Sequence, residues 1–96
     1  MGTADRLFFP GDIVSHFKRD FVTEEERGRG SYLYKIICVA HHTEASEDED
    51  DRMVVYQAMY GDFTTYVRPY GMFMSEVDRD KYPEARQTYR FEKIHG

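Results

Sequence analysis

The sequence predicts a mainly β protein: a small antiparallel barrel with one short helix and a C-terminal strand. Several segments place apolar and polar residues with the two-residue period of strands, and turn residues separate them. The chain has 96 residues, of which 41% are hydrophobic and 16% aromatic. This is enough for one core and too little for two. We therefore expect a flexible leader over residues 1–9 and a single domain over residues 10–96.

The first elements follow a Pro-Gly turn at residues 10–11. Residues 12–17 alternate apolar and polar side chains, which predicts a strand. Thr23 and the glutamates up to Glu26 have the form of a capping box, in which the Thr hydroxyl accepts the amide hydrogen of the third residue on. Glycines at 28 and 30 then end a helix of one or two turns.

Three further strands are expected to form a meander. Residues 31–42 are rich in β-branched and aromatic types, and residues 52–60 follow as their antiparallel partner. A Gly-Asp turn leads into residues 63–68, and Pro69 ends that strand because proline has no amide donor. Both faces of residues 31–42 are partly apolar, which fits a curved barrel whose outer face is also covered.

The last third of the chain is less regular. Residues 70–74 are apolar and turn-rich, and we expect them to close one end of the barrel. A helix across residues 78–87 is compatible with the composition, but Pro83 interrupts it. Residues 88–94 alternate cleanly, which predicts a final strand that closes or edges the sheet.

The charge is unevenly distributed. The formal net charge is −5, and residues 44–51 hold six acidic side chains and no basic one, so the rest of the chain is almost neutral. This balance argues against strong nonspecific binding to nucleic acid or to an anionic membrane. The acidic run is expected to be a solvated loop. An EF-hand-type calcium site is not expected there, because the run lacks the turn glycine.

Cysteine usage and hydropathy indicate the compartment. Cys38 is the single cysteine and forms no internal disulfide, and no apolar run reaches the length of a membrane span or a secretory signal. We therefore expect a cytoplasmic protein. The apolar neighbours of Cys38 predict a buried, inert thiol. We expect no cofactor and no bound metal.

Several blocks of the sequence resemble one family. In order, they are Gly11 to Lys18, Tyr34 to Ile36, Ala40 to Glu44, Val54 to Asp62, and Val67 to Pro69 leading to Met72-Phe73. Together they are similar to the bacterial family called domain of unknown function 1653 over about residues 10–76, and the tail through Ile94 looks like that of longer members. The chain departs from the family's short form by inserting residues 19–31 and by lengthening the acidic loop.

The resemblance implies a small SH3-like β-barrel and supplies no established activity. It also implies a shared surface patch at the polar and aromatic positions that match the family pattern. These positions are His16, Lys18, His42, Thr43, Glu44, Tyr56, Tyr60 and Arg68.

The segment His42-Thr43-Glu44 follows a strand, where side chains project toward a barrel rim. An imidazole and a carboxylate together could bind a metal or transfer a proton. A metal needs three or four ligands, and His16, His41, His42 and Glu44 supply them only if His16 lies beside the end of this strand. The structural alternative is that His42 and Glu44 hydrogen-bond the backbone of the turn and each other.

Arg68 ends a strand and shares its face with Tyr66. A guanidinium binds carboxylates and phosphates in pairs and stacks on aromatic rings. The structural alternative is an ion pair with Glu44 or Glu76 that holds the following segment in place.

Tyrosines are concentrated in or just after the predicted strands. They could form an aromatic cage for a modified side chain, or they could be core residues whose hydroxyls reach the rim. The set is Tyr32, Tyr34, Tyr56, Tyr60, Tyr66 and Tyr70.

These features favour a non-catalytic binding module for a peptide, a modified side chain or a small molecule. Its candidate ligand-binding residues are His16, Lys18, Tyr34, His42, Thr43, Glu44, Tyr56, Tyr60 and Arg68. Two alternatives remain. One is a barrel that binds single-stranded nucleic acid with its aromatic residues and with Lys18, Arg19 and Arg68. The other is a small enzyme that uses His42, Glu44 and His16, with or without a metal.

Overall fold

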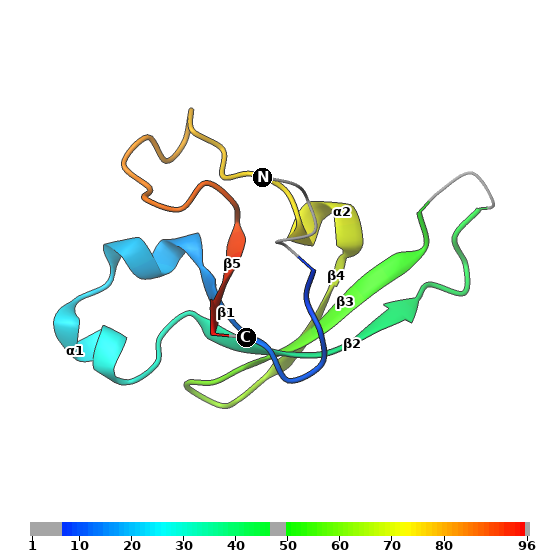
Figure 1. Cartoon of the computed structure of the whole chain (residues 1–96), viewed down its shortest axis with the longest axis horizontal. Coiled ribbons are helices and arrows are strands. Elements are labelled where there is room, and N and C mark those ends of the chain that lie inside the picture. The colour runs from blue at the N-terminus through cyan, green and yellow to red at the C-terminus, as the bar shows by residue number, and fades with distance from the viewer. Residues whose placement is uncertain (1–6, 47–49, 96) are drawn as a thin grey trace.

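The fold is one five-stranded antiparallel sheet with short helices around it, seen in a computed structural model that describes residues 7–46 and 50–95 (Figure 1). The elements are β1 (Ile13–His16), η2 (Phe17–Phe21), α1 (Glu24–Gly28), β2 (Leu33–His41), β3 (Arg52–Ala58), β4 (Thr65–Pro69), α2 (Tyr70–Phe73) and β5 (Phe91–His95). The predicted mainly β class is confirmed. No described helix has the length and apolar character of a membrane span.

The strand order β4-β3-β2-β1-β5 makes β4 and β5 the two edges of the sheet. Strands β2, β3 and β4 form the predicted meander, and the C-terminal strand β5 pairs with β1. No ladder joins β4 to β5 within the described residues, so hydrogen bonds do not close the sheet into a barrel there. The two edges instead meet through side chains, since Arg68 of β4 lies 5.7 Å from the ring centre of Phe91 in β5.

The longest hairpin joins β2 to β3 and extends away from β1, β5 and α1 (Figure 1). Along β3 the buried side chains are Val54, Tyr56 and Ala58, which is the alternation of a strand with one face on a core. A bulge between Ile36 and Cys38 shifts the register of β2. Cys38 is a half-buried free thiol rather than the buried one expected from its neighbours.

The main core packs against the sheet, and half of its buried residues are aromatic. Phe73 of α2 is fully buried and stacks on Phe91 with ring centres 4.0 Å apart, so α2 covers this core. Residues 70–74 were expected to close one end of a barrel, and no ladder closes a barrel within the described residues. Burial of two phenylalanine side chains removes enough apolar area to contribute several kcal/mol to folding. A second cluster joins Phe17 of η2 to Val77, Ala85 and Tyr82 of the later chain.

The insertion between β1 and β2 is braced internally. The predicted capping box is present: Thr23 accepts from the amide of Glu26, whose carboxylate accepts from the amide of Thr23. Arg19 donates to the carbonyls of Ser31 and Arg27. It therefore holds the insertion together.

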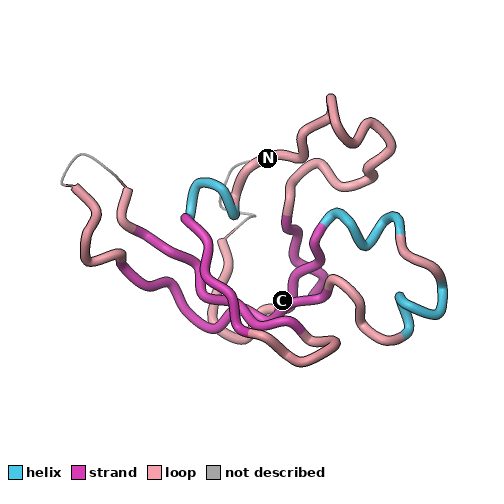
Figure 2. Tube along the Cα trace, turned by 180° about the vertical axis from the view of Figure 1, so that it is seen from behind, coloured by secondary structure: helices cyan, strands magenta, loops and turns pink. Residues whose placement is uncertain are grey.

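The segment from Met74 to Arg90 contains no helix over residues 78–87, and Figure 2 shows it as loop. It is fixed to the domain by long-range hydrogen bonds: Asp20 accepts from the amides of Arg86 and Gln87 (2.8 and 3.2 Å), and the Gln87 side chain bonds Ser15. The carbonyl of Arg90 then accepts a hydrogen bond from the amide of Phe17 (3.0 Å) before β5 begins.

Two predicted segments lie partly outside the described residues. Of the expected leader, the structure describes Leu7 to Phe9, where Phe8 packs edge-on against Phe73 with ring centres 5.8 Å apart. This part of the predicted leader therefore belongs to the domain. The expected acidic loop is described except for residues 47–49, and Asp50 within it binds Arg52.

Candidate functional site

A hollow opens where β1 ends, between the main aromatic core and the second cluster around Phe17. It consists of two adjoining pockets of about 230 Å³ and 200 Å³, which share His16, Lys18 and Arg68 as lining residues. The combined space matches the lower end of the range for small-molecule sites. We refer to it as the β1 hollow.

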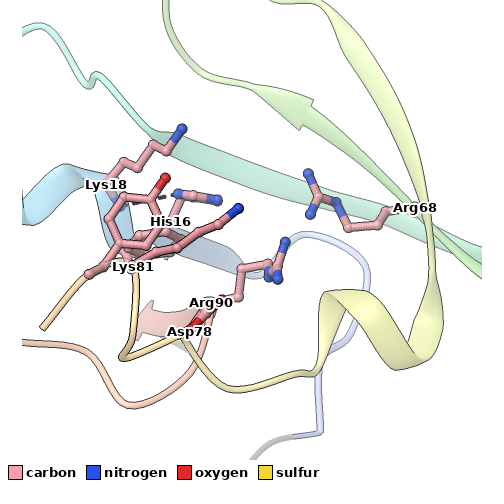
Figure 3. A pocket seen from close by; sticks show the side chains of 8 residues that line it. His16, Lys18, Arg68, Asp78, Lys81 and Arg90 are labelled. Carbon is pink, nitrogen blue, oxygen red and sulfur yellow. Dashed lines mark hydrogen bonds between the residues drawn. The ribbon is translucent and has the colours of Figure 1, made fainter. Parts of the chain in front are cut away.

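Four cationic side chains from three parts of the chain line the β1 hollow. Arg68 comes from β4, Lys18 from η2, Lys81 from the loop after α2, and Arg90 from the residue just before β5. Figure 3 shows the charged ends of Lys81, Arg90 and Arg68 directed toward one space beside His16. The one acidic residue of the lining is Asp78. The hollow is therefore strongly positive in a chain whose formal net charge is negative.

These charges are not neutralised within the described part of the chain. None of the four cations has a carboxylate within salt-bridge distance there, whereas Arg52 and Lys93 elsewhere do. The Nε of Arg90 is buried and has no hydrogen-bond partner among the described residues. A buried donor without an acceptor is costly, so the β1 hollow lacks an acceptor group that a ligand could supply.

His16 lies in the middle of this cluster and is 9% exposed. Its ring stacks on Phe17 and meets the edge of Phe91, and its Nδ1 accepts a hydrogen bond from the amide of Lys18 (3.1 Å). Burial, followed by the charges of Arg68, Lys18 and Arg90, lowers its pKa to about 4. The ring is therefore neutral at pH 7 with its proton on Nε2, so it offers the hollow a donor without adding a charge.

Tyrosines form one wall of the β1 hollow, and Arg68 lies beside them. Tyr34 and Tyr56 are buried and pack edge-on with ring centres 5.3 Å apart, while Tyr66 is 44% exposed and borders the same hollow. The hydroxyl of Tyr56 accepts a hydrogen bond from Nε of Arg68 (3.2 Å), which orients the guanidinium. Burial and the hydroxyl of Tyr60 raise the pKa of Tyr34, so this ring stays neutral.

Five of the nine residues proposed from the sequence line the β1 hollow: His16, Lys18, Tyr34, Tyr56 and Arg68. Tyr60 lies behind the wall, where its hydroxyl is 2.9 Å from that of Tyr34. Arg68 makes no ion pair with Glu44 or Glu76, which was the structural alternative, and bonds Tyr56 instead. Two expectations were open for the tyrosines, core residues or an aromatic surface. Tyr34 and Tyr56 are buried in the core, and Tyr66 is exposed on the surface.

The segment His42-Thr43-Glu44 lies elsewhere, at the far end of the β2–β3 hairpin (Figure 1). His42 and Glu44 border a different pocket together with Met53 and Pro69. Nδ1 of His42 accepts from the amide of Glu44 (2.9 Å), as the structural alternative expected of a turn. His16 does not line this pocket, and the described residues contain no group of three His, Cys, Asp or Glu placed to hold a metal.

Sequence reasoning missed Lys81 and Arg90. Lys81 sits in an irregular loop and has no local pattern that distinguishes it from other surface lysines. Arg90 precedes the predicted last strand, but its position depends on the pairing of β5 with β1, whose register brings Phe91 opposite His16. The neighbours of Arg90 could have been inferred only from the pairing of β5 with β1.

The fold and the site define a small, mainly β domain with a cationic hollow at the end of β1, one wall of which is formed by tyrosines. The chain belongs to the family described as "Protein of unknown function (DUF1653)", whose model matches residues 12–93. No curated protein and no solved structure gives a significant match to the chain.

Proposed function

We propose that the chain is a non-catalytic binding module whose β1 hollow takes the anionic group of a ligand. The observation that carries the proposal is the meeting of Lys18, Arg68, Lys81 and Arg90 in one hollow without a salt bridge among the described residues. Cations brought this close repel one another, and a bound anion would remove that repulsion. The neutral imidazole of His16 adds an N–H donor at the centre.

Single-stranded nucleic acid is a second candidate, favoured by the position of the exposed Tyr66 ring beside Arg68 and Lys18. Bases stack on such rings while cations follow the phosphates. The net charge of −5 and the acidic run at the hairpin oppose it, because a long polyanion would be repelled by the rest of the surface.

Two finer expectations stay as part of the proposal. We expect the sheet to be an SH3-like barrel, supported by its five strands and by the family resemblance. We also expect the protein to act in the bacterial cytoplasm, supported by its single cysteine, Cys38.

Equilibrium titration with inorganic phosphate at fixed ionic strength tests the anion site. Lys81→Gln removes an exposed cation with little risk to folding, and we expect it to weaken phosphate binding roughly fivefold, as the loss of one partly exposed charge–charge contact implies. Lys35→Gln is the matched control, because Lys35 is exposed on β2 and does not line the hollow. Equal losses in both variants, or no phosphate binding by the unmodified protein, would rule out the site.

A further inference from the structure

We propose that the ligand is a small phosphate monoester that carries a planar ring. The phosphate group would sit among Lys18, Arg68, Arg90 and Lys81, and the ring would lie against Tyr66. This inference rests on the proposed function, because it names the ligand of the same anion site.

The number and kind of donors favour a phosphate monoester over a carboxylate. Four cations against the one carboxylate of Asp78 give the lining an excess of positive charge, and the His16 Nε2–H adds a neutral donor. A phosphate monoester carries about −1.5 to −2 charges at pH 7 and three acceptor oxygens, whereas a carboxylate carries one charge and two oxygens. Arg68 and Arg90 enter from opposite edges of the sheet, so each guanidinium could hold a different pair of phosphate oxygens.

The tyrosine wall favours a planar group next to the phosphate. Tyr66 and Arg68 are two residues apart on β4 and so project from the same face, which places the exposed ring directly beside the guanidinium. The ring of Tyr66 is held from behind by Tyr56 and Tyr34, with centres 5.7 and 6.3 Å away. A preorganised, half-exposed aromatic ring offers stacking area at little entropic cost.

The size of the site and the charge of the chain favour a small molecule over a polymer. The two pockets together have room for a phosphate and a ring system, and the acidic character of the remaining chain disfavours a long polyanion. A phosphodiester also brings only one charge per phosphate, which leaves the cations of the hollow less completely neutralised than a monoester does.

The experiment is a calorimetric comparison of phenyl phosphate, methyl phosphate, benzoate and an oligothymidylate without terminal phosphates. The full chain, Tyr66→Ala and the control Phe63→Ala are titrated at one salt concentration. Phe63 is an exposed aromatic residue that does not line the β1 hollow, and Tyr66 is exposed enough for its truncation to leave the fold intact. The unmodified protein should bind phenyl phosphate about tenfold more tightly than methyl phosphate, as stacking on one aromatic ring implies.

In Tyr66→Ala this tenfold preference should fall to about twofold or less, while the affinity for methyl phosphate stays within about twofold; Phe63→Ala should match the unmodified protein. If methyl phosphate binds as tightly as phenyl phosphate, or if phenyl phosphate still binds more tightly than methyl phosphate in Tyr66→Ala, the ring assignment is overturned and the anion site stands. Benzoate binding as tightly as phenyl phosphate would overturn the phosphate assignment, and tighter oligothymidylate binding would overturn the small ligand. Absence of binding by every probe would overturn the proposed function itself.

Discussion

His16 shows how a single buried side chain is set by its surroundings. Its ring is packed between Phe17 and Phe91, and its Nδ1 is occupied by the amide of Lys18. Protonation of His16 would place a further positive charge close to those of Lys18, Arg68 and Arg90, and no carboxylate is among the groups that shift its pKa. The imidazole is therefore held neutral by burial first and by these cations second.

The titration of His16 is the most direct test at this scale. We expect its ring resonances in an NMR pH titration to shift with a midpoint near pH 4, because burial lowers its pKa to about 4. A midpoint near 6.5, the ordinary value for histidine, would contradict the buried and cation-rich environment.

The same shift sets a pH dependence of stability. The unfolded chain binds the His16 proton below about pH 6.5, but the folded chain binds it only below about pH 4, so the unfolded state holds more protons between these values. The free energy of unfolding should therefore fall as pH drops from 6.5 to 4, at up to about 1.4 kcal/mol per pH unit from this group. His16→Asn keeps an acceptor for the Lys18 amide and should show a shallower slope in denaturant unfolding over this range. Identical slopes for the two proteins would mean that His16 does not contribute.

At the level of residues, the sequence predicted part of the site. His16, Lys18, Tyr56 and Arg68 were proposed because they match the family pattern at polar or aromatic positions, and they line the same hollow. Lys81 could not be proposed in this way, since its loop has neither periodicity nor a motif. His42 and Glu44 were grouped with His16, but the length of the β2–β3 hairpin carries them away.

Among the elements, the irregular segment before β5 has the largest consequence for the hollow. It contributes Lys81 and Arg90, yet it has no helix and must be fixed by side-chain contacts. Asp20 of η2 provides one such contact, because one carboxylate oxygen accepts from the amides of Arg86 and Gln87. Asp20 therefore adds a polar contact between the insertion and the tail to the aromatic contact of Phe21 with Tyr82.

Asp20→Ala should weaken this coupling. We expect a loss of about 1 kcal/mol in the free energy of unfolding, because two backbone amides lose a charged acceptor while remaining partly accessible to water. Amide hydrogen exchange should rise at Arg86 and Gln87, and phosphate affinity should drop through the displaced Lys81. Glu84→Ala is the control, since Glu84 is exposed in the same segment. A variant of Asp20 that behaves like the Glu84 variant would show that the contact is unimportant.

Strand and cap patterns were strong predictors of the elements themselves. The capping box at Thr23 and the meander of β2, β3 and β4 are local in sequence and were predicted closely. The last strand begins at Phe91 rather than at residue 88, because Thr88 and Tyr89 donate their amides to the Glu92 carboxylate instead of to a neighbouring strand. Side-chain bonds of this kind leave no periodic signal.

On the scale of the whole molecule, two apolar clusters flank the β1 hollow and hold its walls. Phe91 belongs to the main core and also borders the hollow, while Phe17 and Tyr82 belong to the second cluster and border it from the other side. The hollow therefore depends on both clusters being folded.

Phe73→Ala should expose this dependence. Phe73 is fully buried and stacked on Phe91, so its truncation should cost about 3–5 kcal/mol, a large share of the stability of a domain of this size. Thermal or denaturant unfolding measures the loss, and Phe63→Ala, which truncates an exposed ring, should change stability by less than about 0.5 kcal/mol. Equal effects would show that the core is misassigned.

If the β1 hollow is an anion site, the side-chain Nε–H resonances of its arginines report on it directly. In a ¹H–¹⁵N titration with inorganic phosphate, we expect saturable shifts of the Arg68 and Arg90 resonances. Arg52, which is paired with Asp50 at the hairpin, should not shift. Unchanged Arg68 and Arg90 signals at high phosphate concentration, or equal and unsaturated shifts at Arg52, would contradict the proposed anion site.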